Sequence, residues 1–135
     1  MASVSSSRSP LVDLSPEEFV QSAQPLCLID VRSRLEYHQF HAPDAINLSL
    51  PRILIGRMPI LHNSLPRWLR QLPQETAIAV ICLTAHRSPI AAQALHEMGF
   101  SQIFNISGGM MAWKKAGLPT QSGPSQNSVH EHHMS

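Results

Sequence analysis

The sequence predicts an α/β fold with a mostly parallel central sheet and helices on both of its faces. Short apolar segments alternate with segments of helical periodicity along residues 11–119, which is typical of βαβ units. Residues 77–81 are apolar at every position, as expected for a central strand that is covered on both faces. A length of 135 residues with 43% hydrophobic residues fits one domain with a core of ordinary size.

The elements can be predicted in order along the chain. The expected strands are residues 11–14, 27–30, 45–48, 77–81 and 102–106. The expected helices are one that begins at residue 16, then 34–40, 66–72, 88–98 and 110–116. Ser15 and Glu18 have the spacing of a capping box around Pro16, which suits the first helical position. Gly99 is expected to end the helix over 88–98.

Cys82 stands at the point where the expected central strand ends, a few residues before a helix begins. Ligands of parallel sheets bind beyond the carboxyl ends of the strands. The N–H groups at a helix start lack intrahelical partners and stabilise an anion, and Arg87 adds a positive charge. Such surroundings lower a cysteine pKa from about 8.5 to about 3.5–7.5. We therefore expect Cys82 to be a nucleophile at neutral pH, with a buried and inert strand-end cysteine as the alternative.

The spacing between Cys82 and Arg87 distinguishes two chemistries. Four residues separate them, whereas the corresponding loop of cysteine phosphatases has one residue more and wraps a tetrahedral phosphate. The shorter loop makes a tighter ring of N–H groups, which suits a single terminal sulfur better than three phosphate oxygens.

Four segments resemble those of rhodanese domains and follow in the family's order. Residues 28–37 are similar to the Asp-Val-Arg…Glu-Tyr segment, and residues 41–48 to the His-Ile-Pro-Gly-Ala-Ile-Asn-Ile segment. The Cys82 loop comes next, and residues 108–119 resemble the closing Gly-Gly…Trp…Gly-Leu-Pro segment. The resemblance covers residues 11–119. Ala85 and Phe40 depart from it, because many members have glycine at both positions.

The resemblance implies a rhodanese-like three-layer domain and a sulfurtransferase of the thiosulfate:cyanide type. Cys82 would take a sulfane sulfur from thiosulfate or a persulfide and hold it as a cysteine persulfide. It would then pass that sulfur to cyanide, a thiol or an acceptor protein, with no metal or organic cofactor. The expected substrate-binding residues are those of the loop after the nucleophile: Leu83, Thr84, Ala85, His86, Arg87 and Ser88.

Asp30 and Arg32 are expected at or just past the end of a strand, where the resemblance implies that they support this site. Arg32 is expected to pair with Glu36 one turn on, and a plain surface ion pair is the alternative. Leu83 and Thr84 are uncharged where thiosulfate-specific members often carry a basic residue. We therefore expect weak thiosulfate activity and a persulfide or protein donor. Arg87 would either lower the pKa of Cys82 or pair with a carboxylate and brace the loop.

Three other classes of function remain open. A regulatory rhodanese module that binds a partner protein needs no thiol, and a small cysteine phosphatase or arsenate reductase needs a longer loop. A redox sensor would use Cys82 with a resolving cysteine, and Cys27 is expected to be buried within a strand.

The composition argues against some partners and cellular locations for this chain. A net charge of +1 without a basic stripe argues against nucleic acid, and no apolar run reaches the roughly 18 residues of a membrane span. Two cysteines make no disulfide framework, and no signal peptide is recognised, so a cytoplasmic location is expected. Residues 1–10 and 120–135 are expected to be disordered tails, and the histidines of the second tail to hold no functional metal.

Overall fold

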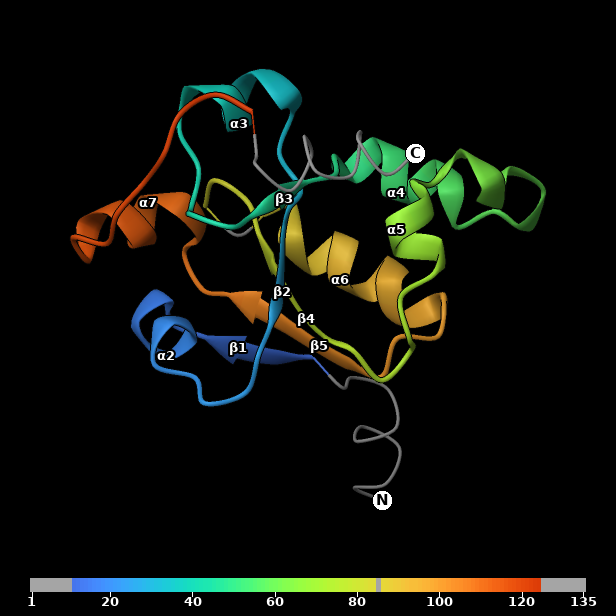
Figure 1. The fold of residues 1–135 in the computed structure, drawn as a ribbon, viewed down its shortest axis with the longest axis horizontal. Coiled ribbons are helices and arrows are strands. Elements are labelled where there is room, and N and C mark those ends of the chain that lie inside the picture. Colours follow the sequence, from blue (N-terminus) through green and yellow to red (C-terminus); the bar gives the residue numbers. More distant parts are fainter. Residues whose placement is uncertain (1–10, 85, 125–135) are drawn as a thin grey trace.

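The computed structural model describes residues 11–84 and 86–124, and it confirms the expected α/β architecture (Figure 1). Within this part of the chain the sheet has five strands in the order β1-β5-β4-β2-β3, and every neighbouring pair is parallel. The strands are β1 (Val12–Leu14), β2 (Cys27–Asp30), β3 (Ile46–Asn47), β4 (Ala77–Ile81) and β5 (Gln102–Ile106). All five expected strands are present, and β3 is shorter than expected.

The helices match the expected positions except in one segment. Those observed are α2 (Pro16–Val20), α3 (Arg34–Gln39), α4 (Leu50–Gly56), α5 (Arg67–Arg70), α6 (Ser88–Glu97), α7 (Gly109–Lys115) and the 3-10 helix η1 (Pro59–Ser64). Neither α4 nor η1 is among the helices expected from the sequence; each has a proline in its first turn but no side-chain cap. Tertiary contact holds this segment instead: a Cβ added at Gly56 would lie 2.2 Å from the side chain of Leu65.

Two hydrophobic layers cover the two faces of the sheet. Figure 1 shows α4, α5 and α6 on one side and α2 and α7 on the other. The side chains of β4 alternate between the two faces of the sheet, which explains this arrangement. Ile78 and Val80 pack in the cluster that contains the buried residues of α6, whereas Ala79 and Ile81 pack with Met110 of α7. Because successive side chains of a strand point to opposite faces, a wholly apolar β4 needs helices on both sides.

Two capping boxes start the helices that precede and follow β2. Ser15 Oγ accepts from the N–H of Glu18 at 3.0 Å, and Glu18 accepts from the N–H of Ser15 at 2.8 Å, which confirms the predicted start of α2. Ser33 and Glu36 form the same reciprocal pair at the start of α3, at 3.2 and 3.0 Å. The second box fixes where the Glu36 side chain lies.

The expected domain limit at residue 119 stays a prediction. Gln121 exchanges backbone hydrogen bonds with His41, both at 2.8 Å, and the N–H of Gly123 donates to the carbonyl of His38. Residues 1–10 and 125–135, including the three histidines near the end, lie outside the described residues. No helix within the described ranges is long and apolar enough to cross a bilayer.

The turn into α7 holds the end of β4 by backbone contact. The N–H of Met110 donates to the carbonyl of Cys82 at 2.7 Å, and that of Met111 to the carbonyl of Leu83 at 3.0 Å. Gly109 has a φ of +60°, and a Cβ there would lie 2.4 Å from the carbonyl oxygen of Cys82. Only glycine permits both this conformation and this approach.

Gly109→Ala should therefore destabilise the fold more than the matched change Gly117→Ala. Gly117 also has a positive φ, +76°, but a Cβ there meets nothing within 4 Å. We expect about 1 kcal/mol for Gly117→Ala, from backbone strain alone, and about 3 kcal/mol or more for Gly109→Ala, from strain and overlap together. Urea unfolding of both variants measures the difference. Equal losses would show that the contact with Cys82 is not limiting.

Candidate active site

Cys82 lies directly after the carboxyl end of β4, and it is 1% exposed. Its Sγ donates to Ser88 Oγ at 3.5 Å, and Ser88 is the first residue of α6. The sulfur therefore lies at the start of a ten-residue helix, where N–H groups and the helix dipole favour negative charge. This is the position that the sequence predicted for the thiol.

The loop between β4 and α6 combines exposed and buried residues. Thr84 and His86 are exposed, and Thr84 Oγ1 lies 2.8 Å from His86 Nδ1. Leu83 and Arg87 are half-buried, and Ser88 is fully buried. Ala85, the sixth of the expected substrate-binding residues, lies outside the described part of the chain.

Arg87 pairs with Glu36 of α3 through two hydrogen bonds, at 2.7 and 3.0 Å. The side chains are 36% and 30% exposed. Chiefly through this hydrogen bond, Arg87 lowers the pKa of Glu36 from 4.5 to about 2. Glu36 in turn raises the pKa of Arg87, and the charges of Cys82 and Asp30 add smaller contributions in the same direction. Arg87 was expected either to lower the pKa of Cys82 or to brace the loop through a carboxylate. The ion pair with Glu36 is the contact expected of the bracing role.

The expected pair between Arg32 and Glu36 is wrong. Arg32 instead binds Asp30, with Nε 3.0 Å and Nη2 2.8 Å from the carboxylate oxygens, and both side chains are buried. Glu36 is unavailable to Arg32 because its carboxylate caps Ser33 and binds Arg87.

The buried pair ties three segments together beneath the loop. Arg32 Nη2 donates to the carbonyl of Phe40 at 2.6 Å, and its guanidinium lies 5.1 Å from the centre of the Phe40 ring. Asn47 Nδ2 donates to the carbonyls of Asp30 and Arg32, at 3.0 and 2.9 Å. The ends of β2, α3 and β3 are thereby joined, and the supporting role of Asp30 and Arg32 for the site stays a prediction.

Two polar residues that the sequence did not single out reach the nucleophile through Ser88. Ser88 Oγ donates to Asn105 Oδ1, and Asn105 Nδ2 donates to Asp13 Oδ1 at 3.0 Å. Asn105 is 5% exposed and lies in the otherwise apolar end of β5, a signal that could have marked it. Asp13 is exposed on the edge strand β1, and nothing local distinguishes it from a surface carboxylate.

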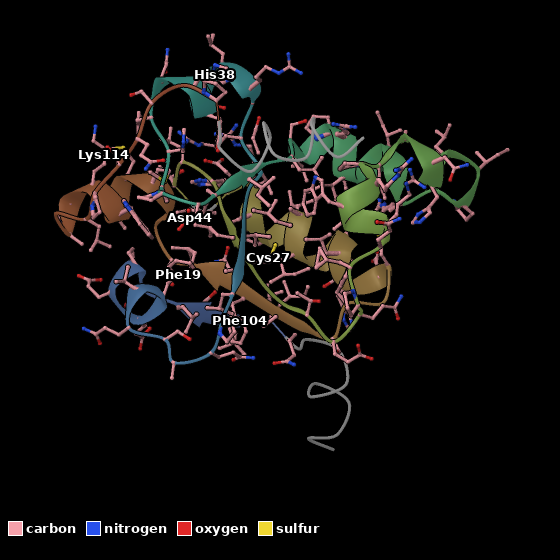
Figure 2. All side chains as sticks on the ribbon, viewed as in Figure 1. Phe19, Cys27, His38, Asp44, Phe104 and Lys114 are labelled. Carbon is pink, nitrogen blue, oxygen red and sulfur yellow. The ribbon has the colours of Figure 1, made fainter. Side chains whose placement is uncertain are left out.

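Cys27 is not a member of the hydrogen-bonded group that contains Cys82, Ser88, Asn105 and Asp13. Figure 2 shows Cys27 on β2, near the middle of the fold. It is half-buried, and burial raises the pKa of its thiol. The described ranges contain no group of three or more histidine, cysteine or acidic side chains that could hold a metal ion.

The sequence profile of the Rhodanese-like domain family matches residues 14–116, so the chain belongs to that family. An uncharacterized protein of Synechocystis is 33% identical over 119 residues, which are 87% of this chain and 60% of that protein. The thiosulfate sulfurtransferase GlpE of Actinobacillus pleuropneumoniae is 30% identical, over 70% of this chain and 77% of its own.

Among solved structures, the polysulfide-sulfur transferase homodimer of Wolinella succinogenes is 32% identical, with a TM-score of 0.58. The alignment covers 90% of this chain and 85% of the Wolinella protein. A rhodanese-related protein of Thermoplasma volcanium shares the fold, with a TM-score of 0.65 at 21% identity, over 82% and 97% of the two chains. The relatives from Actinobacillus and Wolinella are thus both named for sulfur transfer.

Replacing Arg32 should destabilise the protein strongly. Arg32→Ala leaves Asp30 as a buried carboxylate without its cation, and we expect a loss of about 3–5 kcal/mol in the free energy of unfolding. The exposed Arg34 is the matched control, and Arg34→Ala should change this free energy by no more than about 0.5 kcal/mol. Denaturant unfolding compares the two, and similar small losses would contradict a structural role for the pair.

The pair between Glu36 and Arg87 should make stability depend on pH in acid. The folded-state pKa of Glu36 is about 2, below its ordinary 4.5. The ionised carboxylate therefore stabilises the fold above about pH 4.5, and this contribution is lost as the pH falls through about 2. Glu36→Gln should be less stable than wild type at pH 7, and the difference should shrink below pH 4.5. The exposed Glu75→Gln is the control for urea unfolding across this range; a difference that does not vary with pH would refute the assignment.

Proposed function

We propose that the chain transfers sulfane sulfur through a persulfide on Cys82. The observation that supports this most is the position of the Cys82 thiol, 3.5 Å from the first residue of α6, within a loop of the family's length. The thiolate attacks a sulfane sulfur of the donor, a new S–S bond forms on Sγ, and the donor's own S–S bond breaks. Its electron pair leaves with sulfite, a thiolate or a shortened polysulfide.

The second half-reaction restores the enzyme. A nucleophilic acceptor, such as cyanide, a thiol or the thiol of an acceptor protein, attacks the outer sulfur of the persulfide. The persulfide S–S bond then breaks and Sγ leaves as thiolate. Two half-reactions through one covalent intermediate predict ping-pong kinetics.

The surrounding residues have distinct roles in this proposal. The N–H groups of the loop that follows Cys82 hold the sulfur anion as fixed dipoles, and Thr84 and His86 lie at the exposed surface where a donor arrives. Arg87 holds the loop to α3 through Glu36. Asp30 and Arg32 support the loop from β2 and touch neither donor nor acceptor.

Cys82→Ser should abolish transfer, and Cys27→Ser should leave it intact. After incubation with polysulfide, the intact mass of wild type and of Cys27→Ser should rise by one sulfur atom, while Cys82→Ser gains none. A regulatory module, a phosphatase or a redox sensor would not pass that sulfur on to cyanide or a thiol in repeated turnovers. Turnover of Cys82→Ser at about a tenth of wild type, a loss of only about 1.4 kcal/mol in transition-state stabilisation, would mean that another group carries the sulfur.

The preferred donor is proposed to be a polysulfide or persulfide rather than thiosulfate. Leu83 and Thr84 are uncharged, and the guanidinium of Arg87 is already paired with Glu36, so the compact, strongly hydrated charge of thiosulfate gains little at this loop. The Wolinella relative is named for polysulfide, and the GlpE relative for thiosulfate.

We expect kcat/KM for polysulfide to exceed that for thiosulfate by about tenfold or more. A tenfold ratio corresponds to a difference of about 1.4 kcal/mol in transition-state stabilisation between the two donors. Steady-state rates with one thiol acceptor and both donors measure this ratio. Leu83→Lys, which adds the missing cation, should raise thiosulfate turnover. A thiosulfate KM well below millimolar in the wild type would overturn the preference.

A further inference from the structure

Four side chains form a continuous hydrogen-bonded series that runs from the nucleophile to the surface. It passes from Cys82 to Ser88, then to Asn105 and finally to Asp13. The first three are buried, and Asp13 is exposed at the edge strand β1. The members come from the residue that follows β4 and from α6, β5 and β1, so the series runs from β4 across β5 to the edge strand.

The carboxylate of Asp13 determines which group donates and which accepts in each hydrogen bond of this series. An ionised carboxylate only accepts hydrogen bonds, whereas an amide side chain both donates and accepts. Asn105 must therefore turn its Nδ2 toward Asp13, which leaves its Oδ1 facing Ser88. A hydroxyl has a single proton, and Ser88 uses that proton on Asn105. Ser88 consequently presents a lone pair to the sulfur of Cys82.

We propose that Asp13 is a positioning residue that acts through Asn105 and Ser88 to favour the protonated thiol of Cys82 in the resting site. A lone pair on Ser88 accepts from S–H but gives nothing to a thiolate. When the thiol loses its proton to solvent, Ser88 can donate to Sγ only by releasing Asn105. This cost opposes the helix start and Arg87, which favour the thiolate. The inference rests on the proposed function only in taking Cys82 as the nucleophile.

The loop, β2, α3 and α7 carry the other charged groups of this end of the sheet. They are Arg87 and His86 of the loop, Asp30 and Arg32 at and just after the end of β2, Glu36 of α3, and Lys114 and Lys115 of α7. All of them stay unchanged when Asp13 is altered. A change in the titration of Cys82 can then be traced to Asp13 itself, acting either through the series or through its charge.

Asp13→Asn separates these two routes. The substitution is nearly isosteric and lies at an exposed position, so the fold should be retained. The amide that replaces the carboxylate can donate to Asn105, which lets the side chain of Asn105 turn over and donate to Ser88. Ser88 is then free to donate to the thiolate. The pH midpoint of Cys82 ionisation should fall by about half a unit or more.

The midpoint can be measured by thiolate ultraviolet absorbance in a Cys27→Ser background, without any sulfur donor. Asp13→Asn should lower it there, but should have no effect when Ser88→Ala is also present. Glu17→Gln, which removes an exposed carboxylate outside the series, is the control and should leave the midpoint unchanged. An unchanged midpoint in Asp13→Asn, or a shift that persists in the Ser88→Ala background, would overturn the proposal.

Salt provides a second measurement if Ser88→Ala does not fold. A through-space effect of the exposed Asp13 charge is screened at high ionic strength, whereas an effect through adjoining hydrogen bonds is not. The shift should therefore be the same in low and high salt, and its disappearance in high salt would refute the series. Because this titration requires no sulfur transfer, it can succeed or fail independently of the mass measurement on Cys82.

Discussion

The buried polar groups at the carboxyl end of β4 must find partners inside the protein, and the arrangement of the site depends on this constraint. Cys82 lies in the core, and Ser88, Asn105, Asp30 and Arg32 are buried as well. An unpaired buried polar group costs about 1–3 kcal/mol, and a buried charge costs more. Within the described ranges no buried side-chain nitrogen or oxygen lacks a partner. Asp30 is neutralised by Arg32, and Asn105 is satisfied on both sides.

The loop that follows Cys82 is held from two directions by elements distant in the sequence. Backbone N–H groups of α7 bind the carbonyls of Cys82 and Leu83, while Glu36 of α3 binds Arg87. Glu36 can do so because the capping box with Ser33 already orients its side chain. A local feature that begins a helix thus also determines the position of a loop on a neighbouring strand, and the strength of this attachment depends on the ionisation of one carboxylate.

Local pattern was sufficient for the strands, for most helices and for the place of Cys82, because apolar runs, caps and glycines act over a few residues. The partners of Arg87 and Asn105 could not be predicted, since Glu36 and Asp13 lie 51 and 92 residues away in the sequence. The pairing of Arg32 was predicted wrongly because helical spacing was applied to a residue that precedes the N-cap Ser33. Helix α4 was missed, and the close packing of its Gly56 against Leu65 is a tertiary contact that local pattern does not show.

The groups around the sulfur act in opposite directions on the ionisation of Cys82, so they do not maximise the fraction of thiolate. The start of α6 favours the thiolate, but Glu36 offsets the charge of Arg87, and Ser88 offers the sulfur an acceptor. A strongly cationic loop would ionise the thiol fully and attract any small dianion. Because an ion pair has little net charge, we propose that this loop discriminates less by charge and more by what can reach a buried sulfur. A longer sulfur chain, whose charge is spread over polarisable sulfur atoms, suits that requirement better than the compact, strongly hydrated thiosulfate dianion, because its end loses less hydration on entering.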